Sequence, residues 1–121
     1  KAIAFTSLGQ LRYLSALQYV DGVVGNSSSG LVEVPSFKIC TINIGDRQRG
    51  RIKADSVIDC DTSVESIQSS LNKLFSPLFQ EQLQQIKNPY GNGGASKKIV
   101  EIIRIFSLDR VLKKRFYNIN F

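Results

Sequence analysis

Apolar residues along this chain follow two alternating patterns, short β-branched runs and longer stretches with helical spacing. Four short runs predict strands, at residues 3–5, 21–24, 39–44 and 56–60. The run at 39–44 is nearly all apolar, which is typical of a strand buried on both faces. Stretches with helical spacing follow the first, second and fourth runs, and two more precede the end of the chain. This alternation predicts an α/β fold with a parallel sheet and helices on both of its faces.

Helix boundaries are predicted from capping and turn residues. Ser7–Gln10 and Thr62–Glu65 both have the form of a capping box at the start of a helix. Pro77 ends the helix that begins near Thr62 and can start the next one. Residues 88–94 are rich in Gly and Asn and predict a loop, after which a last helix begins at about Ser96.

A loop of small residues, Gly25–Gly30, joins the strand at 21–24 to a short helix that opens at Leu31. Backbone N–H groups at a helix start lack intrahelical partners, and the helix dipole adds roughly half a positive charge. Serine hydroxyls can supplement these amides, and glycine lets the backbone approach a phosphate closely. The loop is therefore a candidate phosphate site. The same residues are also ordinary caps and turn residues, and the loop is not a Walker sequence.

A second polar loop, Asp46–Arg51, follows the strand at 39–44. In parallel sheets, ligands bind outside the carboxyl ends of the strands. Because both loops leave those ends, their serine amides and arginines can converge on one crevice. This convergence favours a site for the phosphates of a nucleotide over two unrelated turns.

Composition narrows the class of protein. The chain has 121 residues, enough for one domain with a hydrophobic core. No apolar run approaches the ~18 residues of a membrane span, and the first residues do not form a signal peptide. The absence of His and the presence of only two Cys argue against a zinc site and suit the reducing cytoplasm. Because the chain opens on Lys1 and contains no Met, we expect it to be part of a longer protein.

The net charge of +6 is compatible with nucleic-acid binding. The basic residues, however, gather in the loop at 47–53 and in the segment 97–115, where they alternate with apolar residues. No known DNA- or RNA-binding motif accompanies either group. We therefore expect neither a nucleic-acid nor a membrane partner, and we expect no metal or cofactor.

Four ordered segments closely resemble the C-terminal part of UDP-N-acetylglucosamine 2-epimerases: Phe5–Leu14, Gly25–Glu33, Asn43–Arg51 and Asn88–Gly93. The resemblance covers residues 3 to about 106. The Asp-Arg-Gln-x-Gly-Arg form of the second loop is similar to the hydrolysing branch, which acts in bacterial sialic or legionaminic acid synthesis. The non-hydrolysing branch carries a Thr-Glu-Arg-Pro-like loop instead. Cys40 departs from the family, which commonly has Pro there, at a strand entrance away from the site.

The family implies two Rossmann-like domains with a UDP-sugar in the cleft between them, the glycosyltransferase-B arrangement. Residues 1–107 would form most of the C-terminal, nucleotide-binding domain, and residues 108–121 a basic and aromatic tail. The general acid/base carboxylates would lie in the missing N-terminal domain, so we expect no catalytic residue in this chain. The resemblance also implies a cytoplasmic enzyme, and we expect it to be a homo-oligomer.

The same resemblance implies which residues contact UDP. Ser28 and Ser29 would bind the diphosphate with their amides, and Glu33 would accept hydrogen bonds from the ribose hydroxyls. Arg47 would face the phosphates, with Arg51 nearby. The predicted UDP-binding set is Ser27, Ser28, Ser29, Gly30, Glu33, Arg47 and Arg51. Tyr13 and Tyr90 are interpreted as packing residues rather than ligands.

The family reaction abstracts the proton at C2 of the sugar and eliminates UDP to leave a glycal. Water then adds and releases the 2-epimeric sugar, such as N-acetylmannosamine. Three other functions stay open. The first two are a UDP-sugar-dependent glycosyltransferase of the same architecture and a non-hydrolysing 2-epimerase. The third is a nucleotide-binding regulatory module without catalysis.

Overall fold

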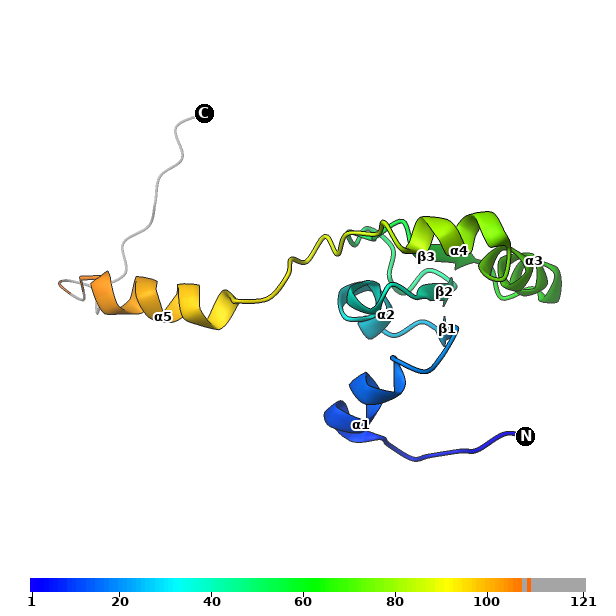
Figure 1. The fold of residues 1–121 in the computed structure, drawn as a ribbon, viewed down its shortest axis with the longest axis horizontal. Coiled ribbons are helices and arrows are strands. Elements are labelled where there is room, and N and C mark those ends of the chain that lie inside the picture. The colour runs from blue at the N-terminus through cyan, green and yellow to red at the C-terminus, as the bar shows by residue number, and fades with distance from the viewer. Residues whose placement is uncertain (108, 110–121) are drawn as a thin grey trace.

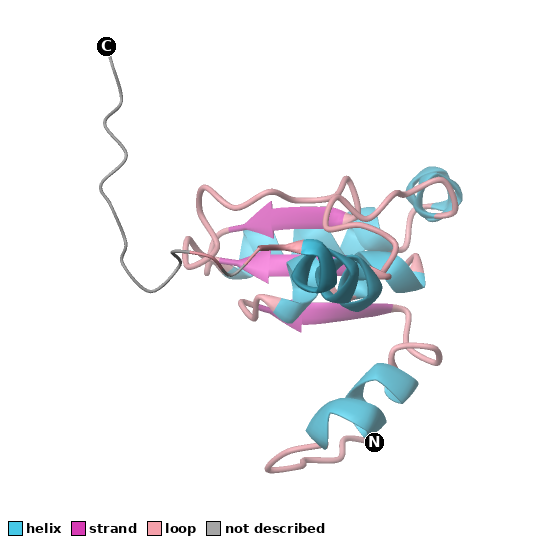
Figure 2. Ribbon diagram, turned by 90° about the vertical axis from the view of Figure 1, so that its left-hand side faces the viewer, coloured by secondary structure: helices cyan, strands magenta, loops and turns pink. Residues whose placement is uncertain are grey.

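Three parallel strands form the centre of the structure, a computed structural model that describes residues 1–107 and residue 109. The strands are β1 (Gly22–Gly25), β2 (Cys40–Ile44) and β3 (Val57–Cys60), in the order β1-β2-β3. Figure 2 shows the three arrows pointing in the same direction. The predicted parallel α/β sheet is therefore confirmed, with the apolar strand at its centre.

Helices precede, connect and follow the strands (Figure 1). They are α1 (Gly9–Ala16), α2 (Ser29–Val32), the 3-10 helix η1 (Val34–Phe37), α3 (Val64–Leu74), α4 (Pro77–Leu83) and α5 (Ala95–Ile105). Both α2 and η1 contact β2, and α3 contacts β2 and β3. The short helix predicted between the first two central strands is thus present as two single turns, α2 and η1.

Alternation along β2 assigns the helices to opposite faces of the sheet, because successive side chains in a strand point to opposite sides. Cys40 and Ile42 are fully buried in the main hydrophobic cluster, together with Leu74 of α3 and Leu83 of α4. Thr41 points the other way and donates its hydroxyl proton to the carbonyl of Gly30 in α2, at 2.8 Å. Helices on both faces, as predicted, therefore cover the sheet.

The predicted strand at residues 3–5 is wrong. Residues 1–8 contain no strand, and the side chains of Ile3 and Phe5 are 80% and 65% exposed. A strand needs a neighbour for its backbone N–H and C=O groups, and no strand of the described chain pairs with this segment. An apolar run alone does not supply that partner.

Two capping predictions also need correction. The first helix begins at Gly9 after Leu8, and the Ser7 hydroxyl only accepts a hydrogen bond from the Gly9 amide, at 3.2 Å. At α3 the cap is Ser63 rather than Thr62, and its hydroxyl accepts a bond from the Ser66 amide. Ser63 has the extended backbone that an N-cap requires, which shifts the cap by one residue.

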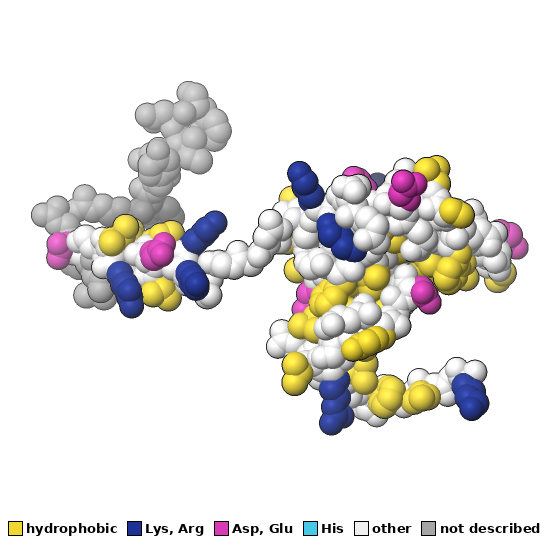
Figure 3. All heavy atoms as spheres, in the orientation of Figure 1, with side chains coloured by type: hydrophobic (Ala, Val, Ile, Leu, Met, Phe, Trp, Pro, Cys, Tyr) yellow, Lys and Arg dark blue, Asp and Glu magenta, His cyan; other side chains and the backbone are white. Residues whose placement is uncertain are grey.

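The predictions for the C-terminal part hold where the structure describes it. Pro77 starts α4, residues 88–94 form a loop, and α5 begins within one residue of Ser96. Every residue of α5 is exposed. Figure 1 shows this helix standing apart from the sheet, and Figure 3 shows hydrophobic side chains on its surface. Apart from residue 109, the predicted tail at 108–121 lies outside the described residues. Among the helices described, none is long and apolar enough to cross a membrane.

Candidate functional site

The serine loop follows β1 at its carboxyl end. Ser27 and Ser28 are exposed, and Ser28 is the N-cap residue of α2 without using its hydroxyl as a cap. The backbone amides of Ser27 and Ser28 donate to no acceptor within residues 1–107. The loop therefore presents unpaired N–H groups and a free hydroxyl at its surface, which is what an anion site requires.

Helix α2 is only four residues long. The sequence predicts a contribution from its dipole to anion binding, but one turn of helix aligns few peptide dipoles. Any attraction for a phosphate therefore comes mainly from the individual amides and hydroxyls of the loop.

Tyr13 reaches the serine loop from α1. Its hydroxyl and that of Ser29 form a hydrogen bond of 2.7 Å, in which either can be the donor. The sequence predicts only a packing role for Tyr13, whereas the structure also shows this polar contact. The bond fixes the Ser29 side chain relative to α1.

A groove of about 560 Å³ lies between the start of α1 and the serine loop. It is within the size range of small-molecule sites. Its lining residues are Ser7, Leu8, Gly9, Gln10, Tyr13, Val23, Ser27, Ser29 and Glu33. Two larger cavities, of about 600 and 800 Å³, lie along α4 and beside residues 88–93 and contain none of the predicted site residues. We therefore place the candidate site at the smaller groove.

The structure brings Ser27, Ser29 and Glu33 together in this groove. Glu33 is half-buried and forms no ion pair with any described residue. Gly30, in contrast, is buried beneath the loop against Thr41, where an added Cβ would lie 2.5 Å from Thr41 Cγ2. The absence of a side chain at Gly30 therefore allows α2 to pack closely on the sheet.

Arg47 and Arg51 lie on the neighbouring loop, which follows β2. Both are exposed, and neither lines the groove. The loop reverses twice, with the Arg49 amide donating to the Asp46 carbonyl at 2.8 Å and the Arg51 amide to the Gln48 carbonyl at 3.3 Å. The structure thus places the two arginines near the ends of a tight double turn.

Gln48 joins the two loops. Its side chain is buried, and its Nε2 donates a hydrogen bond of 2.7 Å to the backbone carbonyl of Asn26. Asn26 directly precedes the three serines. The two loops are therefore in direct contact, although the arginines do not line the groove that contains the serines. Only the position of a neutral amide between two arginines could have drawn attention to Gln48 in the sequence.

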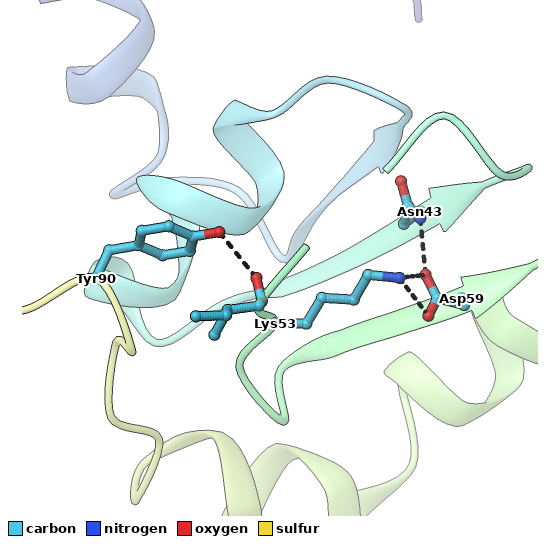
Figure 4. Close-up of polar contacts among 5 residues, drawn as sticks. Asn43, Lys53, Asp59 and Tyr90 are labelled. Carbon is cyan, nitrogen blue, oxygen red and sulfur yellow. Dashed lines mark hydrogen bonds and ion pairs between the residues drawn. The ribbon is translucent and has the colours of Figure 1, made fainter. Parts of the chain in front are cut away.

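The far end of the arginine loop is held by two further contacts (Figure 4). The Tyr90 hydroxyl donates to the Ile52 carbonyl at 3.0 Å, and Lys53 forms an ion pair with Asp59 at 2.7 Å. Asn43 also donates to Asp59, at 2.7 Å. Partial burial alone would raise the pKa of Asp59, but the hydrogen bonds from Lys53 and Asn43 and the charge of Lys53 together hold it below its usual range.

The predicted loop at 88–94 is held by hydrogen bonds to α2 and η1. Asn88 donates from its amide to the Val32 carbonyl at 2.8 Å and to the Ser36 hydroxyl at 2.7 Å. Its Oδ1 accepts a bond from the Tyr90 amide at 2.9 Å, a local turn that Asn favours. Hydrogen bonds thus join Gly25–Glu33 to each of the other three segments that carry the resemblance, through Tyr13, Gln48 and Asn88.

Comparison with known proteins decides the family. A family model described as UDP-N-acetylglucosamine 2-epimerase matches residues 1–104. The chain belongs to the UDP-N-acetylglucosamine 2-epimerase family.

Within residues 1–107 and 109, no group of three or more His, Cys, Asp or Glu side chains could hold a metal ion.

Three relatives within this family are similar to the chain. It is 45% identical over 94 residues to "Polysialic acid biosynthesis protein P7" of Escherichia coli, covering 78% of this chain and 24% of that protein. It is 39% identical over 120 residues to "GDP/UDP-N,N'-diacetylbacillosamine 2-epimerase (hydrolyzing)" of Campylobacter jejuni, covering 98% and 31%. It is 30% identical over 103 residues to "UDP-N,N'-diacetylbacillosamine 2-epimerase (hydrolyzing)" of Legionella pneumophila, covering 84% and 26%. The chain thus spans less than a third of the length of these relatives.

Proposed function

We propose that this chain is the UDP-binding part of a UDP-amino-sugar 2-epimerase of the hydrolysing type. In this proposal the intact enzyme has two Rossmann-like domains in the glycosyltransferase-B arrangement, and the chain supplies most of the C-terminal one. The N-terminal domain supplies the carboxylates that act as general acid and base. The enzyme converts a UDP-sugar and water to UDP and the 2-epimeric sugar.

The observation that carries the proposal is the groove beside the serine loop. It combines the hydroxyls of Ser27 and Ser29 with the Glu33 carboxylate, next to two unpaired backbone amides. The amides are suited to a diphosphate, and a carboxylate is suited to accept hydrogen bonds from the two hydroxyls of a ribose. A nucleoside diphosphate carries both groups at neighbouring positions, which supports UDP as the ligand.

The residues of this chain would stabilise the leaving group, UDP. Removal of the C2 proton lets the C1–O bond break, and the bonding electrons go to the β-phosphate of UDP. Fixed amides and a guanidinium near that phosphate would stabilise its growing charge more than they stabilise the bound substrate. Arg47 and Arg51 are exposed and form no ion pair within the described residues, so either is free to bind a phosphate.

The hydrolysing reaction is supported by the Asp46–Arg51 motif and by the names of two relatives, which include "(hydrolyzing)". Analysis of the products separates this reaction from its alternatives. A hydrolysing epimerase releases UDP and the free epimer from substrate and water alone. A non-hydrolysing epimerase keeps the sugar on UDP, and a glycosyltransferase needs a second acceptor.

A second candidate for the sugar is N,N'-diacetylbacillosamine. Two relatives are named for it, and one of these is named for GDP as well as UDP. Contacts to the sugar would come largely from the N-terminal domain, so the groove distinguishes nucleotides better than sugars. Parallel assays with UDP-N-acetylglucosamine and with UDP- and GDP-N,N'-diacetylbacillosamine identify the substrate.

The role of Arg47 is tested by Arg47→Ala in the intact enzyme. We expect kcat to fall as well as KM to rise, because the guanidinium acts most strongly on the departing phosphate. Arg49→Ala is the matched control, since Arg49 is an exposed arginine of the same loop outside the predicted set. A rise in KM with unchanged kcat would show that Arg47 only binds the substrate.

The proposal includes the partners and the compartment of the enzyme. The main partners are the UDP-sugar and the N-terminal domain of the same polypeptide, and we propose a homo-oligomer. We propose a cytoplasmic location, with which the two free, buried cysteines are compatible.

A further inference from the structure

The contact between Gln48 and Asn26 links the serine loop directly to the arginine loop. The two residues are 22 positions apart in the sequence, and their hydrogen bond measures 2.7 Å. We propose that Gln48 is a positioning residue, which holds the arginine loop and the serine loop in one arrangement competent to bind the diphosphate. This inference rests on the proposed function and goes beyond it, because it assigns a role to a residue outside the predicted contact set.

The burial of Gln48 makes this contact specific. The Gln48 side chain is only 3% exposed, whereas Arg47 and Arg49 on either side of it are exposed. Within residues 1–107 its Oε1 has no hydrogen-bond partner, so the bond from Nε2 to Asn26 is the one that orients the amide. A buried amide with a single hydrogen bond keeps its orientation only as long as that bond persists.

The orientation of the amide is set by chemistry. The Asn26 carbonyl oxygen is only an acceptor, so it requires the –NH₂ group of Gln48 and would repel its oxygen. A carboxylate of the same shape at position 48 would place a charged oxygen against that carbonyl. Gln48→Glu is therefore a near-isosteric substitution that reverses the contact from attraction to repulsion.

The position of Gln48 in the loop explains what the contact controls. At its far end the arginine loop is fixed independently, by Tyr90 on the Ile52 carbonyl and by Lys53 on Asp59 (Figure 4). At its near end the Gly45 amide donates to the Cys60 carbonyl at 2.8 Å, and between the two ends the Gln48 side chain contacts the serine loop. Loss of the Gln48 bond would leave both ends of the loop anchored and would remove the contact that fixes its middle, next to Arg47, relative to the serine loop.

The test uses the intact enzyme with three single variants: Gln48→Glu, Gln48→Met and the control Arg49→Ala. Gln48→Met keeps the length and removes the donor without adding charge, so it separates the lost hydrogen bond from electrostatic repulsion of the ligand. Calorimetric titration with UDP and steady-state kinetics are measured for each. We expect about a tenfold loss of UDP affinity in Gln48→Met and a larger loss in Gln48→Glu, with a fall in kcat, because misplaced binding groups cost rate. Arg49→Ala should bind UDP like the wild type.

A double variant distinguishes positioning from general stability. If Gln48 acts by placing Arg47, then in Arg47→Ala the further substitution Gln48→Met should cost much less UDP affinity than it costs in the wild type. Hydrogen exchange of peptides covering residues 25–33 gives a readout without ligand, and it should increase in Gln48→Met and stay unchanged in Arg49→Ala.

Three results would overturn the positioning role. These are unchanged exchange at residues 25–33, wild-type UDP affinity in both Gln48 variants, or losses that simply multiply in the double variant. Failure of the proposed function looks different: the wild type and Arg49→Ala would then bind no UDP, whatever the exchange of the loop.

Discussion

Replacement of Gly30 by Ala tests the packing beneath the serine loop. An added Cβ at this position would lie 2.5 Å from Thr41 Cγ2 and 3.2 Å from its Oγ1. Non-bonded carbon atoms normally approach to about 3.5–4.0 Å, so the overlap is about 1 Å. Thr41 is 2% exposed and cannot turn away without losing its 2.8 Å hydrogen bond to the Gly30 carbonyl. Either α2 must move away from the sheet or that bond must break.

The expected cost follows from these contacts. Overpacking a core typically costs about 1–3 kcal/mol. The higher helix propensity of Ala offsets at most about 1 kcal/mol of this, and less in a helix of one turn. We therefore expect Gly30→Ala to lower the free energy of unfolding by about 1–2 kcal/mol. Because Gly30 follows the three serines directly, a shift of α2 should also weaken UDP binding.

A double-mutant cycle identifies the clash as the cause. Thr41→Ser removes Cγ2 and keeps the hydroxyl, so Gly30→Ala should cost at least about 1 kcal/mol less in the Thr41→Ser background. Thermal unfolding of the intact enzyme, with hydrogen exchange of peptides covering residues 29–44, measures both costs. A neutral Gly30→Ala, or an equal cost in both backgrounds, would show that contact with Thr41 Cγ2 does not require a glycine at position 30.

Two further predictions follow from the ionisable groups. Burial raises the pKa of Cys40 to about 12, so its thiol should stay protonated and unreactive at pH 8. Iodoacetamide at that pH should leave Cys40 unmodified in the native protein and label it after unfolding. Rapid labelling of the native protein would contradict the burial of Cys40. Asp59 has a pKa held below its usual value of about 3.9, so its contribution to stability is complete above that pH and is lost as pH falls through the lowered pKa. Because the Asp59 side chain is 55% exposed, Lys53→Met should cost less than about 1 kcal/mol at pH 7. The same change should raise the Asp59 pKa in a carboxyl-carbon NMR titration, and an unchanged value would show that Lys53 does not stabilise the carboxylate.

Local patterns predict the central sheet well because its strands are defined by residue types. The run at 39–44 is β-branched and apolar, and it forms the buried strand β2. Pro77 acts within its own turn of helix, so its position at the start of α4 was also predictable. The segment at 3–5 has a similar apolar character but no neighbouring strand, and a sequence pattern does not reveal whether a pairing partner exists.

The parts of the candidate site that follow from residue type could be predicted from the sequence. The parts that depend on tertiary contacts could not. Serines and a carboxylate near the end of a strand point to a nucleotide, and the groove contains Ser27, Ser29 and Glu33. Tyr13 and Gln48 act through partners 16 and 22 residues away, so their contacts depend on the folded arrangement. The UDP contacts of the predicted set, including Arg47 and Arg51, stay a prediction.

The proposed function depends above all on the binding of UDP in the groove beside the serine loop. Saturation-transfer NMR of the intact enzyme, with UDP compared against ADP and UMP, measures this binding. We expect saturation of the ribose and uracil protons of UDP, weaker signals for UMP and ADP, and loss of the ribose signal in a folded Glu33→Ala variant. If UDP receives no saturation from the folded wild type, or if Glu33→Ala binds UDP unchanged, the groove is not the nucleotide site.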